Sequence, residues 1–151
     1  MIIIFLDIDG VMNSDNYYKS VITKKPFSRF DPTSVKIIKN LINEFDAKIV
    51  ISSLWRFAMK KELAKELKSN ALVKHLHNDW STPVLQPSHR GKEIKLWLDM
   101  HPEITNFLII DDDNDILEEH RSKFIKTDIL DGLQAEHYYK ARTILEQYFA
   151  C

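Results

Sequence analysis

Two carboxylates, those of Asp7 and Asp9, stand at the end of the first apolar run of the chain, residues 1–6. If that run is a buried strand, the acids need a partner, because an unpaired charge inside a protein is expensive. Their spacing of two positions places both side chains on the same side of an extended chain. Both carboxylates could therefore act on one bound group, provided that the extended geometry persists through Asp9.

Two later apolar runs end in the same way. Residues 48–51 are followed by two hydroxyl side chains, and residues 106–110 are followed by two further acids. Ligand sites in open parallel sheets form beyond the carboxyl ends of the strands. We therefore expect one shared site, built from Asp7, Asp9, Ser52, Ser53, Asp111 and Asp112.

Four carboxylates near one point repel one another, and each raises the pKa of its neighbours. A hard divalent cation relieves this repulsion, and Mg²⁺ binds carboxylates, water and phosphate oxygens. The pattern thus predicts a Mg²⁺ site that attracts a phosphorylated substrate. The backbone amides that follow Ser53 suit an anion, and the available cations are Arg56, Arg90 and Lys92.

The elements that would position these residues alternate between strand and helix. Apolar runs predict strands at residues 2–7, 48–53, 106–111 and 123–127, and helical periodicity predicts helices at residues 31–45, 55–68, 91–100 and 133–149. Such alternation indicates an α/β fold, Rossmann-like and in three layers, around a mostly parallel central sheet.

Two segments lack a clear period. We expect residues 10–30 to form a long loop or flap, and residues 70–88 to hold a short strand near residues 72–73 or 84–85. His75 and His77 are a weak signal for a metal pair, since no further ligand lies nearby. The lysines of residues 60–68 alternate with acids, which favours a solvated helix face over a nucleic-acid patch.

The composition excludes several classes of protein. A chain of 151 residues fits one domain, residues 1–151, and its net charge of -1 provides no general attraction to nucleic acid or acidic membranes. The one cysteine, Cys151, leaves no disulfide framework and no thiolate metal site. No apolar run approaches the roughly 18 residues of a membrane span. We therefore expect a cytoplasmic protein with no membrane partner.

Four short motifs follow one another along the chain: Asp7-Ile8-Asp9-Gly10-Val11, a strand ending at Ser52, Arg90-Gly91-Lys92-Glu93-Ile94, and a strand ending Asp111-Asp112. On these motifs the sequence resembles the haloacid dehalogenase (HAD) superfamily of phosphohydrolases, over essentially the whole chain. It is most similar to a small cap-less branch that includes the HAD domains of RNA-repair (Swiss Army Knife) proteins. That closer resemblance adds Ser53-Leu54-Trp55-Arg56, Thr82-Pro83, Trp97-Leu98, Asp113 and Gly132-Leu133.

The resemblance implies a role for each acid. Asp7 would be the nucleophile that forms an aspartyl-phosphate, so that hydrolysis proceeds in two displacements. Asp9 would protonate the leaving oxygen and later take a proton from the attacking water. Asp7, the backbone carbonyl of Asp9 and Asp112 would hold Mg²⁺, with Asp111 beside it.

The resemblance also implies phosphate contacts. Ser52 would hydrogen-bond the phosphoryl oxygens, with Ser53 as a second choice. The third-motif cation would be Arg90 or Lys92, and Arg90 fits better because a basic residue followed by glycine precedes the helix. Arg56 would either grip the phosphate or pair with an acid, and the sequence leaves that choice open.

The intervals between motifs have no room for a folded cap domain, so the resemblance implies an open site. An open site accepts a phosphate on a bulky substrate, and the RNA-repair resemblance favours a nucleotide or polynucleotide phosphate. Small-molecule phosphomonoesters remain an alternative. A second alternative is a non-catalytic module of the same fold that binds a protein or nucleic acid, against which the intact Asp7 and Asp9 pair speaks.

Overall fold

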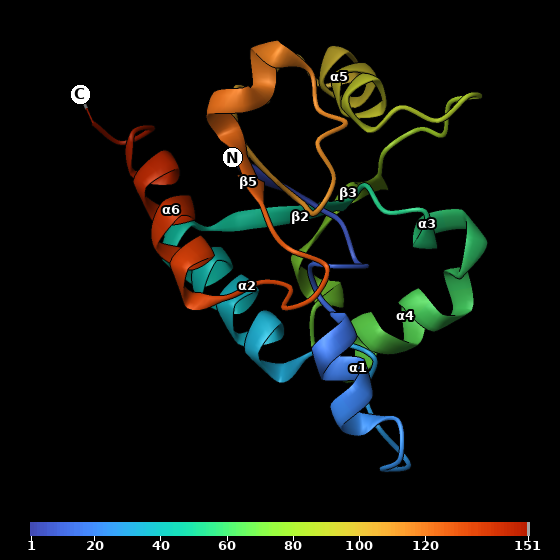
Figure 1. The fold of residues 1–151 in the computed structure, drawn as a ribbon. Helices are drawn as coiled ribbons and strands as arrows, with labels where there is room; N and C mark the ends of the chain where they lie inside the picture. The colour runs from blue at the N-terminus through green and yellow to red at the C-terminus, as the bar shows by residue number, and fades with distance from the viewer. Residues whose placement is uncertain (151) are drawn as a thin grey trace.

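A five-stranded parallel sheet forms the centre of the computed structural model, which describes residues 1–150 (Figure 1). The strands are β1 (Ile2–Leu6), β2 (Ala47–Ile51), β3 (Leu76–Ser81), β4 (Asn106–Asp111) and β5 (Phe124–Lys126), in the order β3-β2-β1-β4-β5. All neighbouring strands pair in parallel, and Leu6 lies between Ile51 and Ile110. This register brings the residues that follow β1, β2 and β4 to one edge of the sheet.

Helices cover both faces of the sheet, which confirms the predicted three layers. Helices α2 (Pro32–Phe45), α4 (Lys60–Ser69) and α6 (Ala135–Glu146) pack on one face, and α5 (Arg90–Met100) packs on the other (Figure 1). Alternate residues of β1 enter the two cores, since Ile4 contacts the first layer and Phe5 lies edge-to-face with Trp97 of α5. The remaining short elements are α1 (Asp15–Val21), α3 (Trp55–Ala58) and the 3-10 turns η1 (Val73–His75) and η2 (Glu118–Lys123).

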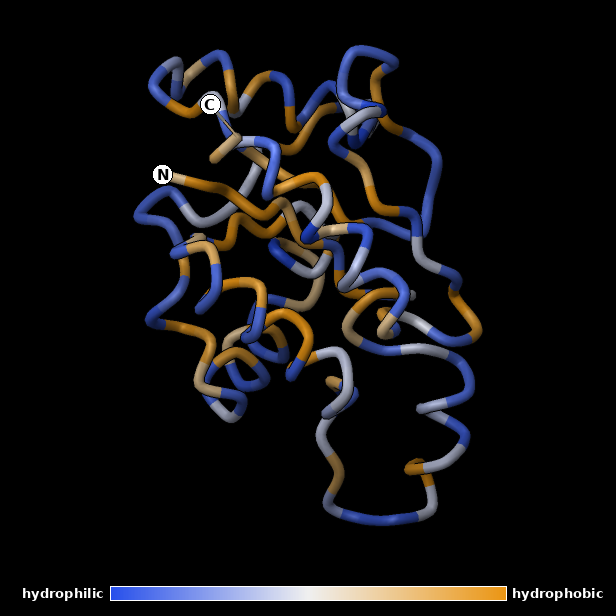
Figure 2. The backbone as a smooth tube through the Cα atoms, turned by 90° about the vertical axis from the view of Figure 1, so that its left-hand side faces the viewer, coloured by the Kyte–Doolittle hydropathy of each residue, from blue (hydrophilic) through white to orange (hydrophobic). Residues whose placement is uncertain are grey.

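The predicted helix start at Asp31 is confirmed. The Asp31 carboxylate accepts a hydrogen bond from Thr33 N at 2.8 Å, and Pro32 occupies the first helical position. Apolar runs that Figure 2 colours orange pass through the middle of the molecule, where β1, β2 and β4 lie. Within residues 1–150 no helix combines the length and apolarity needed to cross a bilayer.

Residues 10–30, which we expected to form a long loop or flap, contain a short helix. Ser14 Oγ accepts a hydrogen bond from Tyr17 N and starts the seven-residue helix α1, which buries none of its side chains. The segment that contains α1 projects from the rest of the molecule at the bottom of both views (Figures 1 and 2). No large cap is inserted anywhere in the described residues, so the predicted cap-less architecture is confirmed.

Two other segments differ from expectation. The helix predicted at residues 55–68 is interrupted at Met59, whose φ of -132° and ψ of 44° are not helical, so that α3 and α4 are separate. The short strand expected near residues 72–73 or 84–85 is instead β3. Leu72 is fully buried outside any strand, and β3 escaped detection because its largely polar sequence pairs on one edge only.

Candidate active site

Three carboxylates converge at the carboxyl edge of the sheet. Asp7 directly follows β1, Asp111 ends β4, and Asp112 follows it. One carboxylate oxygen from each lies within 4.8 Å of the others, and Asp7 and Asp111 are buried, at 5% and 0% exposure. Backbone pairing fixes this arrangement, because Asp7 N donates to Ile110 O at 3.1 Å.

The guanidinium of Arg90 faces this acidic cluster from the start of α5. Its Nε lies 3.2 Å from Asp111 Oδ2 and its Nη1 lies 3.5 Å from Asp7 Oδ1. The Arg90 backbone N–H donates to Asp115 Oδ2 at 2.9 Å, and Gly91 N donates to the Asp115 carbonyl, so the loop after β4 anchors the helix start. The other candidate cation, Lys92, is exposed on α5, so Arg90 is the one that reaches the acids.

Burial changes the acidity of the cluster. Desolvation and the Asp111 carboxylate raise the pKa of Asp7 to about 8, although Arg90 opposes the shift. Burial likewise raises the pKa of Asp111 to about 6, against the opposing charge of Arg90. The cluster therefore resists full ionisation at neutral pH unless an additional positive charge enters it.

Unused polar atoms at this edge fit such an occupant. Within residues 1–150, Ser52 Oγ is buried without a partner, and Arg90 Nη1 and Asp111 Oδ2 are buried with only the Arg90 ion contacts of 3.5 and 3.2 Å and no hydrogen bond. Buried polar atoms in proteins are rarely left in that state. Three carboxylates suit a hard cation, and a hydroxyl beside a guanidinium suits phosphoryl oxygens, so these residues could hold a metal ion and a phosphate.

Gly10 is required by the cluster. Its φ of +75° disfavours other residues, and a Cβ built there would lie 2.4 Å from Asp112 Oδ2. The Gly10 carbonyl accepts a hydrogen bond of 2.6 Å from the buried Thr127 hydroxyl, which ties this turn to the segment after β5. The glycine thus allows Asp112 to approach Asp7.

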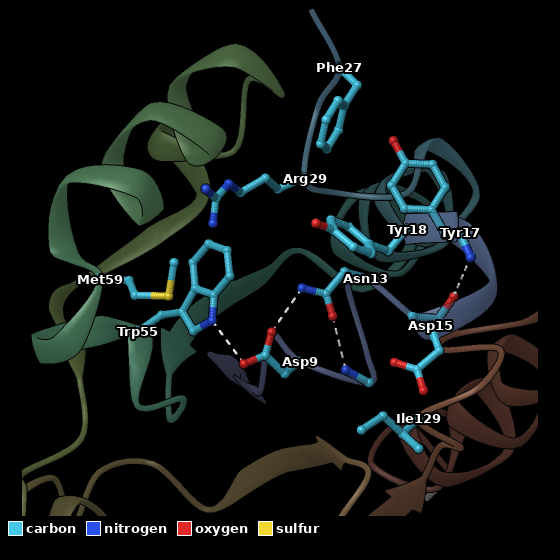
Figure 3. A pocket seen from close by; sticks show the side chains of 12 residues that line it. Asp9, Asn13, Asp15, Tyr17, Tyr18, Phe27, Arg29, Trp55, Met59 and Ile129 are labelled. Carbon is cyan, nitrogen blue, oxygen red and sulfur yellow. Dashed lines mark hydrogen bonds between the residues drawn. The ribbon is translucent and has the colours of Figure 1, made fainter. Parts of the chain in front are cut away.

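Asp9 occupies a different environment. The strand ends at Leu6 and Asp9 lies in a turn, so its exposed carboxylate stands outside the cluster of Asp7, Asp111 and Asp112. Asn13 Nδ2 donates to Asp9 Oδ1 at 2.9 Å, and Trp55 Nε1 donates to Asp9 Oδ2 at 3.0 Å (Figure 3).

These two donors orient the Asp9 carboxylate, and we expected no role for either of them from the sequence. Trp55 lies in the segment Ser53-Leu54-Trp55-Arg56, whose resemblance to the family could have indicated a role for it. Asn13 lay in the segment interpreted as a loop, where no periodicity distinguished it.

Arg56 is a buried residue that connects the segments around the site. Its side chain is 4% exposed and its five N–H groups all find acceptors: the carbonyls of Ser52, Ser53, Thr82 and Pro83 and the carboxylate of Glu93. Of the two roles left open, pairing with an acid is the one present here, at 2.9 Å from Glu93 Oε2. Ser53 Oγ is likewise engaged and accepts from Trp55 N.

Glu93 completes this support and was not singled out by the sequence analysis. It is 1% exposed and also accepts hydrogen bonds from Leu85 N and Ser88 Oγ. The Arg56–Glu93 pair therefore joins the residues after β2, the loop after β3 and the first turn of α5. This connection holds Ser52 and Arg90 at the same edge.

The two histidines that gave a weak metal signal are apart from any such group. His77 lies edge-to-face with Trp97 at 5.2 Å between ring centroids, and within residues 1–150 the one metal-competent group found is that of Asp7, Asp111 and Asp112. Trp80 packs against the first core.

An all-parallel sheet in this order, with a buried acidic cluster at the tip of its central strand and no large inserted cap, defines a HAD-type α/β domain. The sequence-family model of the HAD domain in Swiss Army Knife RNA repair proteins matches residues 3–138. The chain therefore belongs to this family, which confirms the resemblance seen in its motifs. No significant match was found among the curated proteins or the solved structures.

The buried ion pair makes a first prediction. Glu93→Gln keeps the size of the side chain but leaves the Arg56 charge uncompensated, so we expect it to lower the free energy of unfolding by about 3–5 kcal/mol. Urea denaturation followed by circular dichroism measures this loss. The matched control is Asp99→Asn, which changes an exposed carboxylate of the same helix and should have almost no effect. Equal losses in the two variants would contradict the supporting role of the pair.

The acidic cluster makes a second prediction, for metal-free protein. A carboxyl whose pKa is raised by folding costs stability once it ionises, so the contribution of Asp7 to the free energy of unfolding should fall as the pH rises from about 4 to about 8. Asp7→Asn removes that cost and should raise the free energy of unfolding at pH 8 by about 2 kcal/mol, with no gain at pH 4. Thermal melts in a chelator across this range measure it. A variant less stable than wild type at pH 8 would refute the prediction.

Proposed function

We propose that this protein is a Mg²⁺-dependent phosphomonoester hydrolase that acts through an aspartyl-phosphate on Asp7. The observation that carries the proposal is the convergence of two buried acids, Asp7 and Asp111, with the half-buried Asp112, Arg90 and an unpartnered Ser52 hydroxyl at one edge of the sheet. Within the chain, Arg90 compensates these carboxylates only in part, and the Ser52 hydroxyl has no hydrogen-bond partner. A phosphoryl group and a cation satisfy all of them at once.

Each residue then has a defined task. A carboxylate oxygen of Asp7 attacks phosphorus, and the bond from phosphorus to the leaving oxygen breaks. Asp9 gives that oxygen its proton, and afterwards removes a proton from the water that attacks the aspartyl-phosphate. The second displacement releases inorganic phosphate and restores the Asp7 carboxylate.

The phosphoryl oxygens are bound by two groups of the chain. Ser52 Oγ donates one hydrogen bond, and the Arg90 guanidinium stabilises the negative charge that spreads over the oxygens. Mg²⁺ held by Asp7, Asp111 and Asp112, with the Asp9 carbonyl, would neutralise the charge of the transferred group and favour the ionised form of Asp7. Arg56 has no free N–H, so it keeps the site in shape and does not bind substrate.

The division of labour between Asp7 and Asp9 follows from their surroundings. Asp7 is buried beside Arg90, where water is scarce and a nucleophile is held in place. Asp9 is exposed, and Asn13 and Trp55 orient its carboxylate, so it can exchange protons with solvent and with a leaving group. The substrate class inferred from the family is an accessible nucleotide or polynucleotide phosphate.

A third prediction tests this assignment. Asp7→Asn should abolish hydrolysis of 4-nitrophenyl phosphate and of a nucleoside monophosphate in the presence of Mg²⁺. Asp9→Asn should lower kcat by about 10²–10⁴ with a nearly unchanged KM. The loss should be larger for the nucleotide, because 4-nitrophenolate leaves without a proton. Steady-state kinetics on both substrates measures these effects, and Asp113→Asn serves as the neighbouring exposed-acid control.

Two outcomes would contradict the proposal. Full activity in Asp9→Asn would remove the acid–base assignment. If wild type with Mg²⁺ hydrolysed no phosphomonoester of a panel of RNA and DNA ends, mononucleotides, sugar phosphates and phosphopeptides, the chain would instead be a binding module of the same fold.

A further inference from the structure

A cleft of about 490 Å³ opens beside Asp9, and none of Asp7, Asp111 and Asp112 lines it. Trp55, Met59 and Arg29 line one side of it, Tyr17 and Tyr18 line the other, and Phe27 lies at its far end (Figure 3). In the proposed reaction Asp9 protonates the leaving oxygen. The part of the substrate attached to that oxygen therefore lies in this cleft, whose size suits a nucleoside.

The lining of the cleft combines aromatic rings with one guanidinium, that of Arg29, and two carboxylates, those of Asp9 and Asp15. Tyr18 is 51% exposed and stands edge-to-face with Phe27 at 6.3 Å between ring centroids. The exposed Arg29 guanidinium lies 6.0 Å from the ring centre of Trp55. Aromatic faces and guanidinium planes are the surfaces on which proteins stack unpaired nucleobases. The lining thus favours an aromatic base over a sugar or a peptide side chain.

A second hollow of about 660 Å³ continues from the first and shares Phe27 and Arg29 with it. Its other cations are Lys25, from the projecting segment, and Lys61 and Lys65, which stand one turn apart on α4. Two acids of α4, Glu62 and Glu66, also line it.

Glu66 does not oppose a ligand in this hollow directly. It is 4% exposed, and its carboxylate accepts hydrogen bonds from Ser28 Oγ and Arg29 N, which fixes the projecting segment against α4. The accessible charge is therefore that of Lys25, Arg29, Lys61 and Lys65 against Glu62 alone among the lining residues. The sequence favoured a solvated face for these lysines because acids alternate with them, but the fold sorts two of them into a basic groove.

We propose that the cleft and the groove form one binding track for the end of a single-stranded polynucleotide. The nucleoside next to the reacting phosphate occupies the aromatic cleft, and the following backbone phosphates contact Lys61, Lys65 and Lys25. The position of the reacting phosphate rests on the proposed function, whereas binding along the track does not require catalysis. The track makes a polynucleotide end a better ligand than a mononucleotide.

A binding experiment tests the track without turnover. In an Asp7→Asn background with Mg²⁺, fluorescence anisotropy measures the affinity for a short labelled single-stranded RNA with a terminal phosphate. Lys61→Ala with Lys65→Ala should weaken binding by about 10-fold at low salt and reduce the slope of log K against log salt by roughly 1.4, because two phosphate contacts are lost. Lys60→Ala with Lys68→Ala, on the same helix outside the groove, removes equal charge and should change the affinity less than about 2-fold.

A kinetic arm uses the active enzyme. Tyr18→Ala or Arg29→Ala should lower kcat/KM for the RNA end by roughly 5- to 100-fold, the range expected for loss of one stacking partner. The same variants should leave kcat/KM for a small alkyl phosphate such as methyl phosphate nearly unchanged, since its methyl group is too small to reach the rings that line the cleft.

Several results would overturn the inference. Equal effects of the two lysine pairs would show attraction by net charge alone. Competition by polyglutamate as effective as competition by RNA would also show attraction by charge alone. Mononucleotide binding as tight as RNA binding would show that the groove adds nothing to the affinity. Failure of the proposed function is distinguishable, because wild type would then hydrolyse no phosphomonoester while the anisotropy arm still decides whether the track binds RNA.

Discussion

Mutual repulsion among Asp7, Asp111 and Asp112 is the constraint on which the rest of this structure depends. Parallel pairing of β1 with β4 forces these acids together, and burial deprives Asp7 and Asp111 of water. The neighbouring features follow from this constraint. Arg90 supplies one compensating charge, and Gly10 omits a Cβ that would collide with Asp112. Because part of the negative charge remains uncompensated, the cluster could bind a cation.

A second, fully satisfied charge pair gives the site its rigidity. Arg56 and Glu93 meet beneath the active edge, and the guanidinium holds four carbonyl groups from two loops. The two arginines therefore have opposite functions. All five N–H groups of Arg56 donate to protein acceptors, whereas the Arg90 guanidinium contacts the carboxylates of the acidic cluster, Asp7 and Asp111.

The sequence predicted the elements whose signal is local and missed those that depend on distant partners. Strands β1, β2 and β4 were recognisable because burial on both faces makes them continuous apolar runs. Strand β3 and helix α1 were not, since one is a polar edge strand and the other buries no side chain. The gathering of the acids followed from strand order, but the contacts of Asp9 with Trp55 and of Arg56 with Glu93 join residues far apart in the sequence. Only tertiary structure reveals such pairs.

The central claim is that Asp7 carries the phosphoryl group during turnover. Mixing wild type with Mg²⁺ and 4-nitrophenyl phosphate, quenching in acid within the first turnovers and mapping peptides by mass spectrometry tests it directly. The account predicts one phosphoryl group on the peptide of residues 1–19, located at Asp7 by fragmentation and absent from Asp7→Asn. Turnover with the phosphoryl group on another residue, or steady hydrolysis by Asp7→Asn, would contradict it.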